Sequence, residues 1–142
     1  MSSVSRRYYE RGMQFLAAGD VQQAVEQLQA AVDLTPGFGN ARMAFAVALA
    51  RFGDCPRAAS VLRTGLPRAT SAVSAAAMQA TLGDVLTLGG DFFGAEEAFR
   101  IAGATPGFEA RAASGLARVY AKLGRYADSV AALKTAASLA KS

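Results

Sequence analysis

The sequence of 142 residues contains no histidine and no tryptophan, and it has a single cysteine, Cys55. Histidine is the commonest general base and metal ligand in proteins, so its absence removes both. A lone cysteine cannot form an internal disulfide bond, which fits a reducing compartment. The longest apolar run, Met43 to Ala50, has eight residues, whereas a membrane span needs roughly 18. These absences argue against a metal site, a disulfide-stabilised fold and a membrane-spanning helix.

Charged residues make up only 18% of the chain, and hydrophobic residues make up 52%. This composition is typical of one soluble globular domain and excludes a disordered tail. Alanine supplies 33 residues, whereas glycine supplies 14 and proline 4. Such a sequence favours closely packed helices. The N-terminal segment has charge but no apolar stretch behind it, so we expect no signal peptide and a cytoplasmic protein.

Four short segments repeat along the chain. They are GDVQQA from Gly19, GDCPRA from Gly53, GDFFGA from Gly90 and GRYADS from Gly124, at steps of 34, 37 and 34 residues. On each side of these glycines, apolar residues recur with a helical period. Glycine can take the left-handed conformation that ends a helix, and the aspartate after it can cap the next one. Each unit is therefore predicted to be a helix, a Gly-Asp turn and a second helix.

The predicted units span residues 5–38, 39–72, 76–109 and 110–142. Residues 73–75 are then an insertion, which we expect to lengthen the fifth helix. In the fourth unit Arg125 replaces the capping aspartate, so that cap is missing.

Small residues occupy matching places in the four units, and large apolar residues lie between them. The small positions hold Gly12, Ala46, Gly83 and Ala117 in the first helices, then Ala24, Ala58, Ala95 and Ser129, and Ala31, Gly65, Ala102 and Ala136, in the second helices. The large positions hold Phe15, Leu49, Leu86 and Tyr120, then Leu28, Leu62, Phe99 and Leu133. Small residues allow two helix backbones to approach, and bulky ones fill the space beside them.

In this pattern the chain resembles the tetratricopeptide repeat (TPR) family, over nearly its whole length. The resemblance implies an all-α fold, a right-handed α-solenoid of four repeats with eight helices, forming one domain over residues 1–142. It also implies that the first helix of each pair lines a concave groove, which binds a peptide or a helix of a partner. One TPR subclass clamps a carboxylate with Lys and Asn at two groove positions. Here Tyr9 and Met13 stand there, so we reject that clamp.

Catalytic chemistry finds little support in these residues. A serine or cysteine nucleophile would need a lysine or carboxylate base, and no such pairing occurs at motif spacing. Glu96 and Glu97 are adjacent on a predicted helix, so their side chains point about 100° apart. Cys55 stands at a repeat position that is apolar elsewhere, which favours a packing role. We therefore expect no enzyme activity, no cofactor and no metal.

The net charge of +4 raises the question of nucleic acid. By unit, counting residues 73–75 with the second, the net charges are −1, +4, −4 and +5. This alternation interrupts the continuous basic track that binding to phosphates favours. Neighbouring units with net charges of opposite sign attract each other, which favours contacts between repeats.

The candidate groove residues follow from the family's concave positions. They are Tyr9, Met13, Met43, Val47, Arg51, Asp84, Arg118 and Lys122. The first four predict an apolar patch, and Arg118 with Lys122 predicts a basic patch at i, i+4 spacing. Methionine adapts readily to a partner surface. An equally weighted interpretation is that Met13 and Met43 fill gaps between repeats as ordinary core.

The leading hypothesis is a non-catalytic adaptor or scaffold that binds a peptide or amphipathic helix of a partner protein. The alternatives are a self-assembling structural protein, and a chaperone-like or regulatory subunit of a larger machine. Val130, Leu133, Ala137 and Ala140 form an apolar stripe on the last predicted helix, with no further helix in the sequence to cover it. This stripe predicts self-association through the C-terminal repeat, or that the sequence is a piece of a longer protein.

Overall fold

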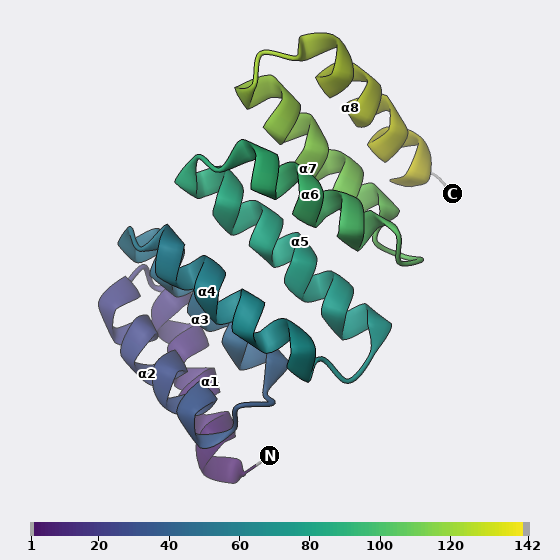
Figure 1. Cartoon of the computed structure of the whole chain (residues 1–142). Helices are drawn as coiled ribbons and strands as arrows, with labels where there is room; N and C mark the ends of the chain where they lie inside the picture. The colour runs from purple at the N-terminus through teal and green to yellow at the C-terminus, as the bar shows by residue number, and fades with distance from the viewer. Residues whose placement is uncertain (1, 141–142) are drawn as a thin grey trace. The chain divides into compact units, whose positions relative to one another are not determined.

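The computed structural model describes residues 2–140, and these form eight α-helices and one short 3-10 helix, with no strand among them. The helices are α1 (Ser3–Ala17), α2 (Val21–Leu34), α3 (Gly39–Phe52), α4 (Cys55–Gly65), η1 (Leu66–Arg68), α5 (Ala72–Gly89), α6 (Phe92–Gly103), α7 (Glu109–Lys122) and α8 (Tyr126–Ala140). Figure 1 shows them as four antiparallel helix pairs. The predicted all-α architecture of four helix-turn-helix repeats is confirmed.

The helix ends confirm the Gly-Asp turns. Asp54 caps α4 by accepting a hydrogen bond from the backbone N–H of Arg57 at 3.2 Å, and Asp20 and Asp91 cap α2 and α6 in the same way. Gly53, at the end of α3, has a φ of 105°, a conformation that costs glycine no steric clash. The turn is therefore determined locally, by residues that lie within a few positions of one another.

The structure divides into two compact units, Met1–Ala69 and Thr70–Ser142. The first unit holds α1 to α4 with η1, and α2 packs between α1 and α3 while α3 packs on α4. Leu28, Leu49 and Leu62 are fully buried in it. Gly12 of α1 lies against Leu28, because a Cβ at Gly12 would come within 2.5 Å of the Leu28 side chain. The predicted packing of small residues against large ones is therefore confirmed in the first unit.

The second unit holds α5 to α8, in which each helix packs on the next. Three of its helices approach closely at Phe99 of α6, whose ring lies against Gly83 of α5 and Gly115 of α7. Phe99 is fully buried. At 18 residues α5 is longer than the other first helices, which have 14 or 15, so the predicted effect of the insertion is confirmed.

The last helix departs from the predicted packing at one position. Leu133 belongs to a set of large residues in which Phe15 is half-buried and Leu28, Leu49, Leu62, Leu86, Phe99 and Tyr120 are buried, yet Leu133 is 55% exposed. The physical reason is that α8 packs on α7 alone within the described residues. Val130 is 50% exposed, and Ala137 and Ala140 are exposed too, so the predicted stripe does face outward. None of the helices within residues 2–140 combines the length and the apolar character needed to cross a membrane.

Candidate functional site

In the first unit, the predicted groove residues come from the first helices of the two repeats, α1 and α3, which contact each other. Met13 is 39% exposed, whereas Tyr9, Met43 and Val47 are half-buried and Arg51 is exposed. The Tyr9 ring packs against Phe38, with 4.9 Å between the ring centroids. We call Tyr9, Met13, Met43 and Val47 the apolar patch. Its four side chains are each partly accessible, so the patch is neither fully core nor fully solvated.

In the second unit, an acidic residue binds two arginines of the next repeat. Asp84 of α5 accepts hydrogen bonds from Arg118 at 2.8 Å and from Arg111 at 3.2 Å, both on α7. These side chains are between 39% and 64% exposed, and pairs of this kind contribute only about 0–1 kcal/mol each. Their main effect is to hold Arg118 in place. Arg118 is thus paired with Asp84, and the predicted basic patch is a mixed cluster of Asp84, Arg111, Arg118 and Lys122 with a formal charge of +2.

The structure reveals a buried arginine that sequence reasoning missed. Arg42 of α3 is only 7% exposed, and its guanidinium donates hydrogen bonds to the carbonyl oxygens of Val61 at 3.2 Å and Pro36 at 3.0 Å. Burial, and then the positive charge of Arg68, lowers the pKa of Arg42. Gly65 allows this placement, since a Cβ there would come within 2.1 Å of the Arg42 side chain. The sequence did contain a signal for this burial, because Gly65 stands at a repeat position that holds alanine in the other repeats.

Arg42 forms part of a pocket of about 470 Å³ in the first unit. Figure 1 shows α2 and α4 lying in front of α1 and α3, and the pocket is the groove between α2 and α4 with α3 as its floor. Its lining consists of Val32, Asp33, Pro36, Arg42, Phe45, Arg57, Ser60, Val61 and Thr64. The guanidinium of Arg57 lies over the Phe45 ring, 5.5 Å from its centroid. We call this pocket the outer groove of the first unit.

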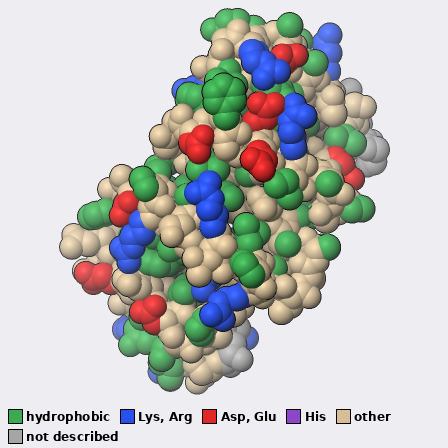
Figure 2. All heavy atoms as spheres, in the orientation of Figure 1, with side chains coloured by type: hydrophobic (Ala, Val, Ile, Leu, Met, Phe, Trp, Pro, Cys, Tyr) green, Lys and Arg blue, Asp and Glu red, His purple; other side chains and the backbone are tan. Residues whose placement is uncertain are grey.

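Charged side chains of both signs lie over α6 to α8 in the second unit. In Figure 2 acidic and basic side chains alternate on the face shown over these helices. This mixing agrees with the sequence-based argument against a continuous basic track for nucleic acid.

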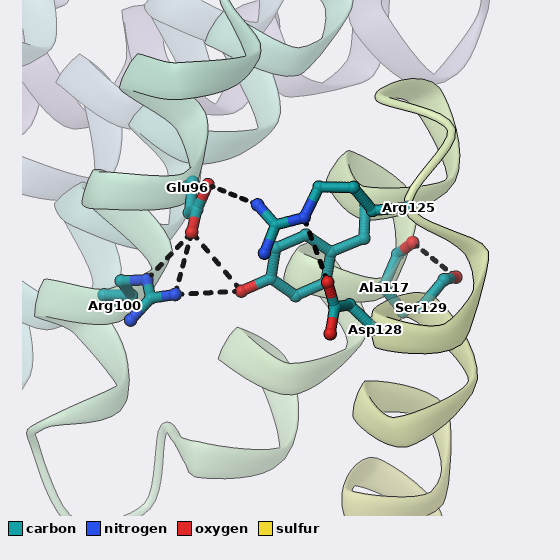
Figure 3. A network of polar contacts seen from close by, with 7 residues as sticks. Glu96, Arg100, Ala117, Arg125, Asp128 and Ser129 are labelled. Atoms are coloured by element: carbon teal, nitrogen blue, oxygen red, sulfur yellow. Dashed lines mark hydrogen bonds and ion pairs between the residues drawn. The ribbon is translucent and has the colours of Figure 1, made fainter.

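A connected network of polar contacts in the second unit is drawn in Figure 3. Glu96 of α6 accepts hydrogen bonds from Arg100 at 2.8 Å and from the hydroxyl of Tyr120 at 3.4 Å. Arg125 lies 3.6 Å from the other oxygen of Glu96 and 3.0 Å from Asp128. The Glu96 side chain is only 16% exposed, and these contacts tie α6 to α7 and to the start of α8. Arg125, which replaces the capping aspartate, therefore links two repeats instead.

Residues 2–140 contain no group of three or more His, Cys, Asp or Glu side chains close enough together to hold a metal ion.

Comparison with known proteins identifies the repeat. Two family models described as tetratricopeptide repeat match residues 15–82 and 110–142, which together are well over half of the chain. No curated protein matches the sequence.

Solved structures show the same fold. A putative kinesin light chain with nearly identical TPR-like repeats from Podosopora anserina superposes with a TM-score of 0.78 at 20% identity, covering 98% of this chain and 77% of that one. MamA from Desulfovibrio magneticus RS-1, from residue 41 to its end, gives 0.76 at 20% identity with the same coverage. Another crystal structure of MamA gives 0.76 at 23% identity, covering 94% of this chain and 77% of that one. At such identities the likeness concerns the fold alone. With its four helix-turn-helix repeats and its two family matches, the chain belongs to the tetratricopeptide repeat family.

Proposed function

We propose that the chain is a non-catalytic adaptor or scaffold that binds a peptide or an amphipathic helix of a partner protein. The family and the fold indicate a protein-interaction scaffold, and TPR proteins are typically non-catalytic. The observation that carries the finer proposal is the apolar patch on α1 and α3. Met13 is 39% exposed, and flexible methionine side chains adapt to the shape of a partner. A helix that inserts apolar residues every three or four positions would bury this patch.

The mixed cluster of the second unit supplies the electrostatic part of the proposal. Arg111, Arg118 and Lys122 outnumber Asp84, so a partner with Asp or Glu near its apolar anchors would be attracted. Charges at such exposed positions act mainly on the association rate, whereas buried apolar anchors determine how long the complex lasts. That the patch and the cluster line one concave groove stays a prediction.

The proposal is tested by identifying the partner and then changing each group separately. A photo-crosslinking residue at Met13 recovers the partner, which is then titrated against Met43→Asp and against the double variant Arg118→Glu with Lys122→Glu. We expect Met43→Asp to weaken binding at least about tenfold at every salt concentration, because it introduces an unpaired charge among apolar contacts. The double variant should weaken binding most at low salt, where screening is least.

Ile101→Asp is the matched control for Met43→Asp, since it introduces the same charge at an exposed apolar position on α6 that belongs neither to the apolar patch nor to the α8 stripe. Circular dichroism establishes that each variant is folded. If neither groove variant changes the affinity and both are folded, the ligand binds elsewhere and the assignment of the site is wrong.

The exposed stripe of α8 favours a second function, self-assembly through the C-terminal repeat. Val130 and Leu133 are 50% and 55% exposed, and apolar side chains gathered on one surface often mark an interface. We expect the protein to form dimers or larger species with rising concentration, and Leu133→Lys to shift them toward the monomer. Light scattering over a concentration series measures this. A purely monomeric wild-type protein at the highest concentration would exclude self-assembly.

A further inference from the structure

The outer groove of the first unit contains two arginines without an acidic partner. Among the described residues neither Arg42 nor Arg57 forms an ion pair. The hydrogen bonds of the Arg42 guanidinium go to two neutral backbone carbonyls, and the Arg57 guanidinium rests on the Phe45 ring. Arginine stays protonated in proteins even when its pKa is lowered. A buried positive charge without a counter-charge is unusual, because removal from water is costly for an ion.

The guanidinium of Arg42 also has N–H donors that make no hydrogen bond to another described residue. It carries five N–H bonds, and the structure accounts for one on each of its two terminal nitrogens. The hydroxyl groups of Ser60 and Thr64 line the same groove and have no hydrogen bond to another described residue. The groove thus offers charged and neutral donors together.

The second unit shows how an arginine that lies over an aromatic ring is paired with a carboxylate of the same chain. There an arginine, Arg125, also lies over an aromatic ring of a first helix, 4.5 Å from the centroid of Tyr120. A carboxylate, that of Glu96, lies between Arg125, Arg100 and the Tyr120 hydroxyl (Figure 3). Counted from the glycine of each turn, the residue of α2 that corresponds to Glu96 of α6 is Val25, which has no charge. Arg42 and Arg57 correspond to Ala113 and Asp128 of the fourth repeat, so the two units share an arginine on an aromatic ring but not its repeat position, and only the second unit supplies a carboxylate beside it.

We propose that the outer groove of the first unit binds a carboxylate side chain, Asp or Glu, of an acidic segment of a partner protein. The carboxylate enters between α2 and α4, and accepts hydrogen bonds from Arg42 and Arg57. It thereby supplies the counter-charge that Glu96 supplies in the second unit. A pocket of about 470 Å³ accommodates one acidic side chain with part of its backbone. Asp33 also lines the groove on its α2 side, so the two arginines leave the groove with a net charge of +1.

This site is separate from the apolar patch of the proposed function. Arg42 and Met43 are adjacent on α3, so their side chains point about 100° apart. Occupation of the outer groove does not require the patch, and the two proposals can fail independently.

The test uses a capped tripeptide, acetyl-Ala-Glu-Ala-amide, and its glutamine analogue as probes of the whole 142-residue chain. Nuclear magnetic resonance follows the backbone amides and the arginine side-chain N–H groups. We expect saturable shifts at Arg42, Arg57 and Thr64 with the glutamate peptide, and binding at least about tenfold weaker with the glutamine peptide, since a charged hydrogen bond is lost. Inorganic phosphate, titrated separately, distinguishes a carboxylate site from a general anion site.

The variant Arg57→Gln tests the groove without removing Arg42, which also holds the backbone of residues 36 and 61. We expect it to weaken binding of the glutamate peptide about three- to tenfold. Arg63→Gln is the matched control: it lies on the same helix, is exposed, does not line the groove and removes the same charge. It should leave the affinity within about twofold. Equal effects of Arg57→Gln and Arg63→Gln, tighter binding of phosphate, or absence of saturable shifts would each overturn the proposal.

Discussion

Replacing Gly115 with alanine should destabilise the second unit by about 1–3 kcal/mol, the usual cost of overpacking a core. A Cβ at this position would lie 2.4 to 2.6 Å from three atoms of the Phe99 ring, a separation that requires something to move. Phe99 is fully buried, and its ring also lies against Gly83 of α5. A shift of the ring away from the added methyl group would therefore have to displace other packed groups. The sign of the effect is informative, because Gly→Ala inside a helix ordinarily stabilises a protein by about 0.5–1 kcal/mol.

Urea denaturation followed by circular dichroism measures this change. Gly37→Ala is the control, because no atom lies within 4 Å of a Cβ built at Gly37, and we expect it to change stability by less than about 0.5 kcal/mol. Adding Phe99→Leu to Gly115→Ala should recover part of the loss, since the smaller side chain makes room. The two changes would then couple in a double-mutant cycle. An alanine variant as stable as the wild type would show that the helices are less closely packed than the structure indicates.

Removing residues 110–142 should destabilise the remaining part of the second unit. Without α7, Phe99 loses the helix that covers one face of its ring, and exposing a side chain of this size costs about 1.5–3 kcal/mol. The contacts of Asp84 and Glu96 with the fourth repeat are lost as well. In stacked repeats much of the stability resides in the interfaces between neighbours. The third repeat should therefore lose stability, although all of its own residues are still present.

Hydrogen exchange measured by mass spectrometry resolves this effect by helix. We expect amide protection in α5 and α6 to fall at least about tenfold to a hundredfold, in line with the loss of one such interface. Amides of α1 and α2 serve as the internal control, because these helices pack within the first unit. Undiminished protection in α5 and α6 would mean that each helix pair is stable alone, contrary to repeat stacking.

The amino-acid sequence alone determined the helices, the turns between them and the pairing of small with large residues. The reason is that these features depend on neighbours close in sequence. A glycine ends a helix at its own position, and Asp54 caps α4 through a residue only three positions away. The packing of Gly12 on Leu28 follows in turn, since two helices joined by a short turn can pack in few ways. The exposed stripe on α8 could be predicted for the same reason. A single domain over residues 1–142 stays a prediction beside the two compact units of the structure.

Only the tertiary structure decided which charged groups meet. Arg118 and Asp84 are 34 residues apart in sequence, and Tyr120 and Glu96 are 24 apart. Helical periodicity places each of these side chains on a face, but long side chains have several rotamers on that face. The neighbouring helix selects among them. Arg42 is the clearest case: charge predicts exposure for an arginine, and its burial follows from the space left by Gly65 and from two backbone carbonyls that the fold brings within reach.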